Sequence, residues 1–402
     1  MKIKIPNYIN NIITSLNLRG HSAYMVGGCV RDALLGREAY DFDITTSASP
    51  KQIKEVLCRF KTIDTGIKHG TVTVVTDEGS AEITTYRIDG KYTDNRRPDG
   101  VVFTNSLKED LSRRDFTINA FAYNDTNGLI DLFGGVDDLK NGIIRAIGDA
   151  KIRFSEDSLR ILRAVRFCAQ LGFSAEENTS RAMLEMCSLL KNISRERVKS
   201  EIEKTLVSPY AENSLKSFKS IISTALGVSE ELINYKGISN VSPENDLRFA
   251  FLLYKASNAS EIMHSLKCES VLQKSVALLC ENIYFQPESE YELKKYISKH
   301  SIDHTKKLCE LKLAANIRDA EEFRKLLYGI DFTKSCFSVK ELNISGDDLI
   351  DLGYNGTSIG EILSELLDMV MRNEIKNERS ALISQASKLH CIHLKPTLNH
   401  HV

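Results

Sequence analysis

Two aspartates separated by one residue, Asp41 and Asp43, have a type and spacing that suggest chemistry. They lie in the segment DFDITT, which predicts a short β-strand, and alternate side chains of a strand leave the same face. Two carboxylates on one face can hold Mg²⁺, a hard ion that takes oxygen ligands and also binds substrate phosphates. Metal ions held in this way activate an attacking hydroxyl and stabilise a departing phosphate oxygen. Two exposed acids near a turn are the plain alternative.

A glycine pair and an arginine precede the aspartates and make the pattern more specific. Gly27 and Gly28 end a predicted strand and begin a predicted helix, so the backbone there can approach a triphosphate. Arg31, in the first turn of that helix, can reach the same phosphates. Gly-Gly, arginine and the aspartate pair at this distance are a far stronger signal together than an Asp-x-Asp pair alone.

A second arginine motif, RRDFTINA, contains Arg113, Arg114 and Asp115 beside the start of an apolar helix. A triphosphate that loses pyrophosphate needs fixed cations, and the planar, always-charged guanidinium suits phosphate. The structural alternative is a surface arginine pair next to an aspartate that caps a helix.

The segment EDSLRILRAVRF predicts a helix with regularly spaced charges. Asp157, Arg160, Arg163 and Arg166 recur every three residues and should lie along one slowly drifting stripe, with apolar residues packed around it. The plain alternative to a ligand-binding role is a solvated stripe with one salt bridge, worth about a few tenths of a kcal/mol.

The elements that must position these residues change character along the chain. Up to about residue 148, predicted helices alternate with strands at AYMVGG, DFDITT, TVTVVT and SAEITTYRI, of which the last two can form a hairpin. From Ile152 onward, apolar residues recur at helical spacing with little strand-like alternation. We therefore expect an α+β head, a mixed sheet with flanking helices, followed by an all-α C-terminal half.

Length and composition limit the possible classes of protein. A chain of 402 residues is expected to contain roughly two to three domains. Its 53 basic and 54 acidic residues give a net charge of −1, so any affinity for RNA must come from local patches. The nine cysteines are scattered singly, which indicates reduced thiols. With no signal-peptide pattern and no membrane-spanning run, we expect a soluble, cytoplasmic protein.

The motifs together resemble those of the class II CCA-adding enzymes and bacterial poly(A) polymerases, members of the polymerase-beta nucleotidyltransferase superfamily. The matching motifs follow in order over roughly the first half of the chain: GGCVRDALLGREAYDFDI, TGIKHGTVTV, EITTYRIDGKYTDNRRPDGVVF, EDLSRRDFTINAFAY, DLFGGVDDL, EDSLRILRAVRF and SRERVKSEIEKTL. The resemblance implies a nucleotidyltransferase head over residues 1–148 and a base-recognising helical neck over 149–207. A helical body over 208–330 and a tRNA-binding helical tail over 331–402 would follow.

The resemblance also implies a reaction: template-independent addition and repair of the 3′-terminal CCA of tRNA from CTP and ATP, with release of pyrophosphate by two-metal nucleotidyl transfer. The cofactor would be Mg²⁺, held by Asp41 and Asp43. Glu82, from a neighbouring strand, is the candidate third catalytic carboxylate, and a cross-strand partner for a cation is its alternative role. The residues that would bind the nucleotide are Gly28, Arg31, Arg114, Asp157, Arg160, Arg163 and Arg166.

Within that set, the resemblance gives Asp157 and Arg160 the choice of base and places Arg163 and Arg166 nearer the phosphates and ribose. Cytosine and adenine each present an amino donor beside a ring acceptor. An aspartate can accept from the amino group, and an arginine can donate to the ring acceptor. Uracil and guanine present a carbonyl where the amino group belongs, and a buried mismatch of that kind is heavily penalised. One Asp–Arg pair would therefore select C and A without a template.

Two further segments have a less certain meaning. SRERVKSEIEKTL places Arg197, Glu201 and Lys204 at helical spacing, for which ion-paired helix support is the equal or better interpretation. The loop between Arg87 and Asp110 is long for a compact domain, which favours a functional lid. By resemblance, its presence favours full CCA addition, or A addition, over CC addition.

Several alternatives stay open. They are a bacterial poly(A) polymerase, an A-adding tRNA nucleotidyltransferase and, from another class, an inactive RNA-binding relative. Poly(A) polymerases of this kind tend to carry a long basic C-terminal extension, whereas the sequence given ends in LKPTLNHHV. The sequence leaves the oligomeric state open, a homodimer included.

Overall fold

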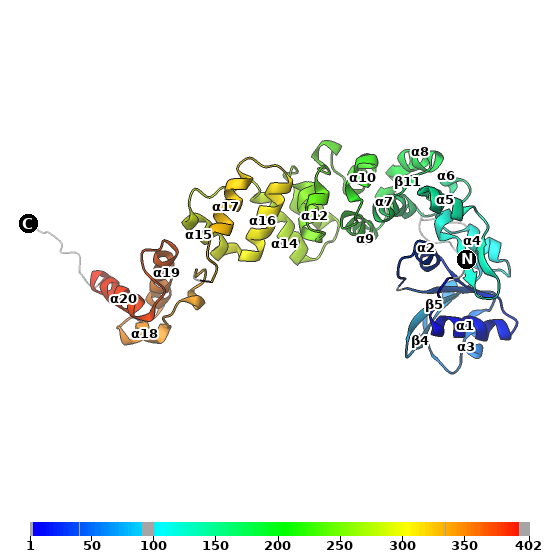
Figure 1. Ribbon diagram of the computed structural model, residues 1–402, viewed down its shortest axis with the longest axis horizontal. Coiled ribbons are helices and arrows are strands. Elements are labelled where there is room, and N and C mark those ends of the chain that lie inside the picture. Colours follow the sequence, from blue (N-terminus) through cyan, green and yellow to red (C-terminus); the bar gives the residue numbers. More distant parts are fainter. Residues whose placement is uncertain (1–2, 40, 91–99, 334, 394–402) are drawn as a thin grey trace, which may run out of the picture.

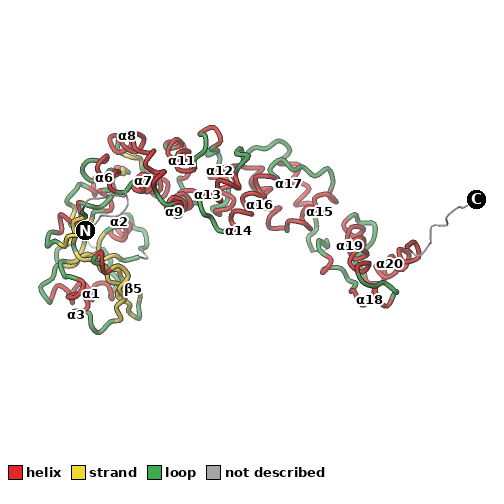
Figure 2. Tube along the Cα trace, turned by 180° about the vertical axis from the view of Figure 1, so that it is seen from behind, coloured by secondary structure: helices red, strands yellow, loops and turns green. Residues whose placement is uncertain are grey.

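The protein is an elongated, curved molecule with a sheet-containing head at one end and the last three helices at the other (Figure 1). The computed structural model describes residues 3–39, 41–90, 100–333 and 335–393. Figure 2 shows the strands concentrated at the head end and helices over the remaining length. The expected α+β head followed by an all-helical half is therefore confirmed.

A seven-stranded mixed sheet forms the centre of the head, in the order β3-β4-β5-β2-β1-β8-β9. Neighbouring strands run antiparallel except β2 and β5, which are parallel, and the expected hairpin of β4 and β5 is present. The strands are β1 (Ala23–Val26), β2 (Asp43–Thr46), β3 (Lys61–Gly66), β4 (Thr71–Thr76), β5 (Gly79–Thr85), β8 (Phe121–Asn124) and β9 (Gly128–Asp131).

Short helices cover this sheet because their apolar residues fall on one face. In the first helix, Ile9, Ile12, Ile13 and Leu16 are buried at the i, i+3, i+4 and i+7 spacing of an amphipathic helix. A capping box formed by Ser49 begins the third helix. The head helices are α1 (Asn7–Leu18), α2 (Gly28–Leu34), α3 (Pro50–Val56), α4 (Leu107–Ser112) and α5 (Gly135–Asn141).

The long loop expected after Arg87 lies partly outside the described residues. Its described ends form two short antiparallel strands, β6 (Arg87–Asp89) and β7 (Val101–Phe103). The segment between them, residues 91–99, is not described, so the interpretation of this loop as a lid stays a prediction.

Helices follow one another from residue 150 onward, and a short parallel pair, β10 (Ile143–Ile144) with β11 (Ser174–Ala175), ties the end of the head to the neck. The neck contains α6 (Ala150–Glu156), α7 (Leu159–Leu171), α8 (Glu177–Met186) and α9 (Arg195–Leu206). The body contains α10 (Ala211–Ser217), α11 (Lys219–Leu226), α12 (Asn245–Leu253), α13 (Ala259–Ser265), α14 (Ser270–Glu281), α15 (Glu290–His300), α16 (Ile302–Ala314) and α17 (Ala320–Gly329). The tail contains α18 (Gly346–Asp351), α19 (Thr357–Met371) and α20 (Arg379–His393).

One continuous apolar core runs from the head through the neck and body, whereas the tail packs around a core of its own that includes Leu349, Leu366 and Leu382. Polar contacts join the two: Tyr291 of α15 donates to Asp368 of α19 over 2.5 Å. The body therefore holds the tail through a small set of side chains rather than through a shared core.

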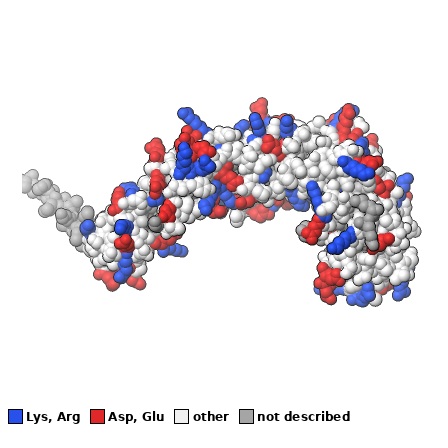
Figure 3. Space-filling view, in the orientation of Figure 1, with Lys and Arg blue, Asp and Glu red and all other residues white. Residues whose placement is uncertain are grey.

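Two expectations from composition can be compared with this structure. The cysteines whose side chains are described are free thiols, as their scattered spacing indicated. Among the described residues, none of the helices has the length and apolar character that a bilayer crossing requires. Acidic and basic side chains are interspersed over the face seen in Figure 3, in keeping with the balanced net charge.

Candidate active site

A cleft of about 470 Å³ lies where the head meets the neck. The turn before α2, the start of β2 and the segment after α4 line it from the head, and α7 and α9 line it from the neck. Its lining residues are Gly27, Gly28, Cys29, Arg31, Asp32, Glu38, Ala39, Asp41, Asp43, Arg114, Asp115, Asn119, Arg163, Arg166, Phe167 and Lys204. The cleft therefore combines carboxylates with arginines from both parts.

Asp41 and Asp43 both line the cleft, but they do not share a strand. Strand β2 begins at Asp43, whose backbone pairs with Val26, and Asp41 lies in the connection before it. Burial raises the pKa of the Asp43 carboxyl, Arg114 lowers it, and Asp41 raises it. The two carboxylates thus lie close enough for one negative charge to disfavour the other.

Glu82 lies beside Asp43 in the parallel pairing of β5 with β2. Burial raises its pKa, and the charges of Asp43 and Asp41 raise it further. Glu82 is not among the described residues that line the cleft, and within the described residues no three His, Cys, Asp or Glu side chains gather into a metal site. Its role as a third carboxylate stays a prediction.

The glycine pair before α2 brings the backbone close to these groups. Gly27 has a φ of +80°, which L side chains rarely adopt, and a Cβ there would lie 3.0 Å from Nη1 of Arg114. A Cβ at Gly28 would meet Nη2 of Arg31 at 3.6 Å, which is ordinary contact. The geometry therefore requires glycine at position 27, which the sequence analysis named together with Gly28 but left out of the residues expected to bind the nucleotide.

Arg31 is 8% exposed and is held on two sides at the edge of the cleft. It pairs with Asp32 over 2.8 Å and donates to Oδ1 of Asn119 over 2.7 Å. Asn119 in turn donates to Asp115. Asn119 was missed by the sequence analysis because an uncharged amide gives no signal without its partners.

Arg114 is the least satisfied arginine of the cleft. Its nearest carboxylate partner, buried Asp110, lies 3.9 Å away, and its buried Nε has no hydrogen-bond acceptor among the described residues. The adjacent Arg113 instead points to Asp110, at 2.8 Å. The structure thus separates the two arginines of the RRDFTINA motif: Arg113 supports the head, and Arg114 faces the cleft with a spare donor.

Asp115 orients an arginine of the neck. Its carboxylate pairs with Arg163 over 2.7 Å. Burial raises the pKa of Asp115, but Arg163 and the hydrogen bond from Asn119 outweigh burial and lower the pKa to about 2. The Asp115–Arg163 pair is therefore ionised and crosses from the head to α7 of the neck.

The expected stripe of charges along one helix is divided in the structure. Helix α7 begins at Leu159, so Asp157 lies outside it, at the junction with α6. Arg163 and Arg166 line the cleft, whereas Asp157 and Arg160 are not among its described lining residues. Each three-residue step turns a helical side chain by about 60°, which over two steps carries Arg160 away from the direction of Arg166.

Asp157 and Arg160 are held by separate partners. Arg197 of α9 binds Asp157 with two hydrogen bonds, of 2.9 and 3.3 Å. Arg160 donates to Glu156 over 2.7 Å and to the carbonyl of Arg113 over 2.9 Å. The proposed base-reading pair is thus adjacent in the chain but is not joined side chain to side chain.

Helix α9 acts both as support and as part of the cleft wall. Arg197 fixes Asp157, and Glu201 pairs with Arg166 over 2.6 Å. Both contacts agree with the interpretation of this segment as a helix that supports its neighbours through ion pairs. Lys204 lines the cleft and forms no ion pair among the residues that the structure describes. The i, i+4, i+7 spacing places Lys204 on the same helix face as Arg197 and Glu201. This spacing could have predicted Lys204 as a residue of the cleft.

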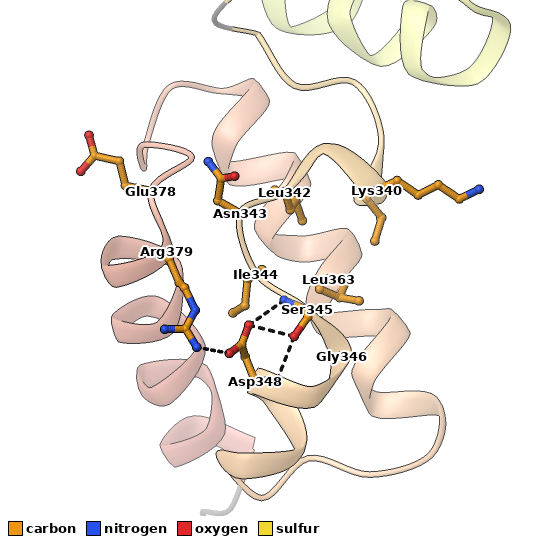
Figure 4. A pocket seen from close by; sticks show the side chains of 11 residues that line it. Lys340, Leu342, Asn343, Ile344, Ser345, Gly346, Asp348, Leu363, Glu378 and Arg379 are labelled. Atoms are coloured by element: carbon orange, nitrogen blue, oxygen red, sulfur yellow. Dashed lines mark hydrogen bonds and ion pairs between the residues drawn. The ribbon is translucent and has the colours of Figure 1, made fainter.

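A larger cavity, of about 900 Å³, lies in the tail, and its charged side chains do not converge on one space as those of the head–neck cleft do. Asp348 caps α18 through Ser345 and is ion-paired with Arg379 (Figure 4). Figure 4 shows the side chains of Lys340 and Glu378 extending away from this ion pair. The head–neck cleft, with several carboxylates and arginines facing one space, is the better candidate for a catalytic centre.

The fold of the head and the composition of the cleft define a nucleotidyltransferase. Residues 23–145 match the family model described as "Poly A polymerase head domain". Residues 243–386 match a model for tRNA nucleotidyltransferase domain 2.

Comparison over nearly the whole length shows the family: the chain belongs to the CCA-adding enzymes, as the motifs indicated. It is 37% identical over 385 residues to the CCA-adding enzyme of Geobacillus sp. (strain WCH70), covering 91% of this chain and 92% of the relative. It is 38% identical over 395 residues to the CCA-adding enzyme of Lactococcus lactis subsp. cremoris (strain MG1363), covering 94% and 95%.

Solved structures show the same relationship. The Bacillus stearothermophilus CCA-adding enzyme in complex with CTP has a TM-score of 0.81 at 29% identity, covering 97% of this chain and 99% of that one. The Thermotoga maritima CCA-adding enzyme complexed with tRNA has a TM-score of 0.72 at 22% identity, covering 98% and 100%, and bears on the fold alone.

Proposed function

We propose that this protein adds and repairs the 3′-terminal CCA of tRNA, using CTP and ATP and releasing pyrophosphate. The observation that carries the proposal is the cleft in which two head carboxylates face arginines supplied by both head and neck. The membership of the chain in the family of CCA-adding enzymes supports the same reaction. Neither the composition nor the relatives described above favour a poly(A) polymerase.

Nucleotidyltransferases of this family generally use divalent metal ions, and we propose Mg²⁺ here. The residues fit such an ion: Asp41 and Asp43 present oxygen ligands to the cleft, and the raised pKa of Asp43 reflects burial and an adjacent negative charge. Bound there, the ion would activate the 3′-hydroxyl of the tRNA and stabilise the departing pyrophosphate. Glu82 is the proposed third carboxylate.

The arginines are proposed to bind the triphosphate and ribose. Arg114 has a buried donor with no described acceptor, so a phosphate oxygen would satisfy a group that is otherwise costly to bury. Arg31, Arg163 and Arg166 are already fixed by acidic or amide partners. A cation fixed before the ligand arrives needs no reorganisation as charge develops on the phosphate.

We propose that Asp157 and Arg160 select the base by the hydrogen-bonding scheme derived from the sequence. Each has unused capacity: carboxylate oxygens can accept several hydrogen bonds, and a guanidinium carries five N–H donors. Arg160 is fixed by Glu156 and by a head carbonyl, so its position depends on how head and neck meet. Binding of the base would require both side chains to turn toward the cleft.

The test uses tRNA that lacks its last three nucleotides, with Mg²⁺ and labelled CTP or ATP. CTP alone should extend the tRNA by CC, and both nucleotides together should complete CCA. Extension of tRNA ending in CC by A, without C addition to the shorter tRNA, would identify an A-adding enzyme. A long A tract would identify a poly(A) polymerase, and binding without extension would identify an inactive relative.

A further inference from the structure

The ring of Phe167 is surrounded by three arginines of the cleft. Phe167 lies in α7, is 4% exposed and lines the cleft. The guanidinium carbons of Arg166, Arg31 and Arg163 lie 4.4, 5.0 and 5.4 Å from the centre of its ring. The ring also packs edge-on against Phe116, at 5.8 Å between centroids. One aromatic side chain therefore contacts one arginine of the head and two of the neck.

Three guanidinium groups around one side chain repel one another, so their relative positions need support. Each arginine has one acidic partner: Arg31 with Asp32, Arg163 with Asp115 and Arg166 with Glu201. The negative face of an aromatic ring attracts a cation within about 6 Å. Unlike a further carboxylate, the ring neither occupies N–H donors nor cancels the positive charge. It can hold the arginines while their donors stay available to a ligand.

We propose that Phe167 is a positioning residue of the nucleotide site, which fixes Arg31, Arg163 and Arg166 relative to one another while leaving their donors free for the phosphates and ribose. The proposal rests on the proposed function of the cleft. Because Arg31 belongs to the head and the other two arginines to the neck, the same ring also sets how the two parts meet at the nucleotide. An ordinary core phenylalanine would have no such effect on nucleotide binding.

A matched control is available in the neck. Phe154 of α6 is fully buried in the same apolar core, and no arginine lies over its ring among the described residues. Phe154→Leu and Phe167→Leu therefore remove a buried ring of the same size from the same part of the molecule. Phe167→Tyr keeps the aromatic ring and tests whether a ring at this position is sufficient for normal nucleotide binding.

The experiment measures the Kd for CTP by calorimetry, with Mg²⁺ and without tRNA, and then kcat and the KM for CTP with tRNA lacking CCA. Phe167→Leu should raise Kd and KM by roughly tenfold, in line with the strength of partly buried cation–π contacts, while changing kcat far less. Phe167→Tyr should stay within about threefold of the unmodified protein, since its ring retains the same face. Phe154→Leu should lower the melting temperature and leave Kd and KM unchanged.

Two results would overturn the role of Phe167: an unchanged Kd for CTP in Phe167→Leu, or an equal rise in Phe154→Leu. If Phe167→Leu does not fold, Phe167→Met replaces it, because methionine fills the space without a ring. The proposed function fails separately, if the unmodified protein transfers no CMP to tRNA. The Kd for CTP still tests Phe167 in that case.

Discussion

Lys312 of the helical body and Arg114 of the head–neck cleft are two cations whose donors are satisfied in different ways. In the body, Lys312 is 1% exposed and donates to the carbonyl of Phe285 over 2.5 Å, and its ammonium nitrogen lies 5.0 Å from the centre of the Phe323 ring. In the cleft, Arg114 has a buried Nε donor with no acceptor among the described residues.

The difference separates a structural charge from one that serves a ligand. A buried cation with an internal acceptor completes the fold, and its removal should affect stability first. A cation that faces a cavity with an unused donor gains its acceptor when a ligand binds. Charge alone would not distinguish Lys312 from Arg114, whereas the position of their acceptors does.

The largest effect is expected from the cleft carboxylates. Asp41→Asn or Asp43→Asn should lower transfer of both CMP and AMP by about a thousandfold or more, because each change removes a charged metal ligand worth several kcal/mol. Binding of tRNA, measured by filter retention, should change little. Asp137→Asn is the matched control, since Asp137 is an exposed acid of the same domain. Near-normal turnover in Asp41→Asn or Asp43→Asn would refute the metal site.

Arg160→Ala should reduce discrimination between bases. Without this donor, the advantage of CTP over UTP in kcat/KM should shrink by about 1–3 kcal/mol, the usual cost of an unpaired buried partner. Arg153→Ala provides the control, because Arg153 shares Glu156 as a partner and has no proposed contact with the base. Equal slowing with all four nucleotides would show that Arg160 supports the neck and does not select the base.

A smaller effect, of pH on stability, is expected from the body. His304 is buried beside Tyr296, whose hydroxyl lies 3.0 Å from Nε2. Burial, together with the charge of His300, lowers the pKa of His304 to about 4. This pKa lies below that of the unfolded chain, so the unfolded state takes up the proton first. The contribution of the neutral imidazole is therefore present above about pH 6.5 and is lost as pH falls toward 4.

Chemical unfolding should accordingly show a free energy of unfolding about 2 kcal/mol lower at pH 5 than at pH 7.5 from this group. His304→Gln removes the titration and should flatten that part of the profile. A variant whose profile keeps the full slope would show that another group causes it, such as His300, whose pKa is also lowered by burial.

Much of the site could be predicted from the sequence because its residues occur in short motifs. Asp41, Asp43, Arg114 and Arg163 all line the cleft. Local spacing indicated the chemistry of the two aspartates, and the resemblance of the motifs added the roles of the two arginines. The helical half could be predicted from the periodicity of its apolar residues. That periodicity does not show which helices share a core, so the separate core of the tail became visible only in the structure.

The features that could not be predicted depend on contacts between distant segments. Arg197 binds Asp157 from 40 residues away along the chain. Arg31 meets Phe167 across the boundary between head and neck. Periodicity identified Phe167 as an apolar residue of the helix, but it could not show that the arginines surround its ring.

The most direct test of the distinction between cleft and body compares one variant of each region, Arg114→Ala and Lys312→Ala. The Kd for CTP and the free energy of unfolding are measured for both. Arg114→Ala should weaken CTP binding by about ten- to a hundredfold, because a hydrogen bond to a charged phosphate contributes about 1.5–3 kcal/mol, and should cause little loss of stability. Lys312→Ala should leave the Kd unchanged and lower the free energy of unfolding by about 1–3 kcal/mol, because the Phe285 carbonyl loses its partner. Unchanged CTP binding in Arg114→Ala, or weakened binding in a folded Lys312→Ala protein, would contradict the assignment of the nucleotide to the head–neck cleft.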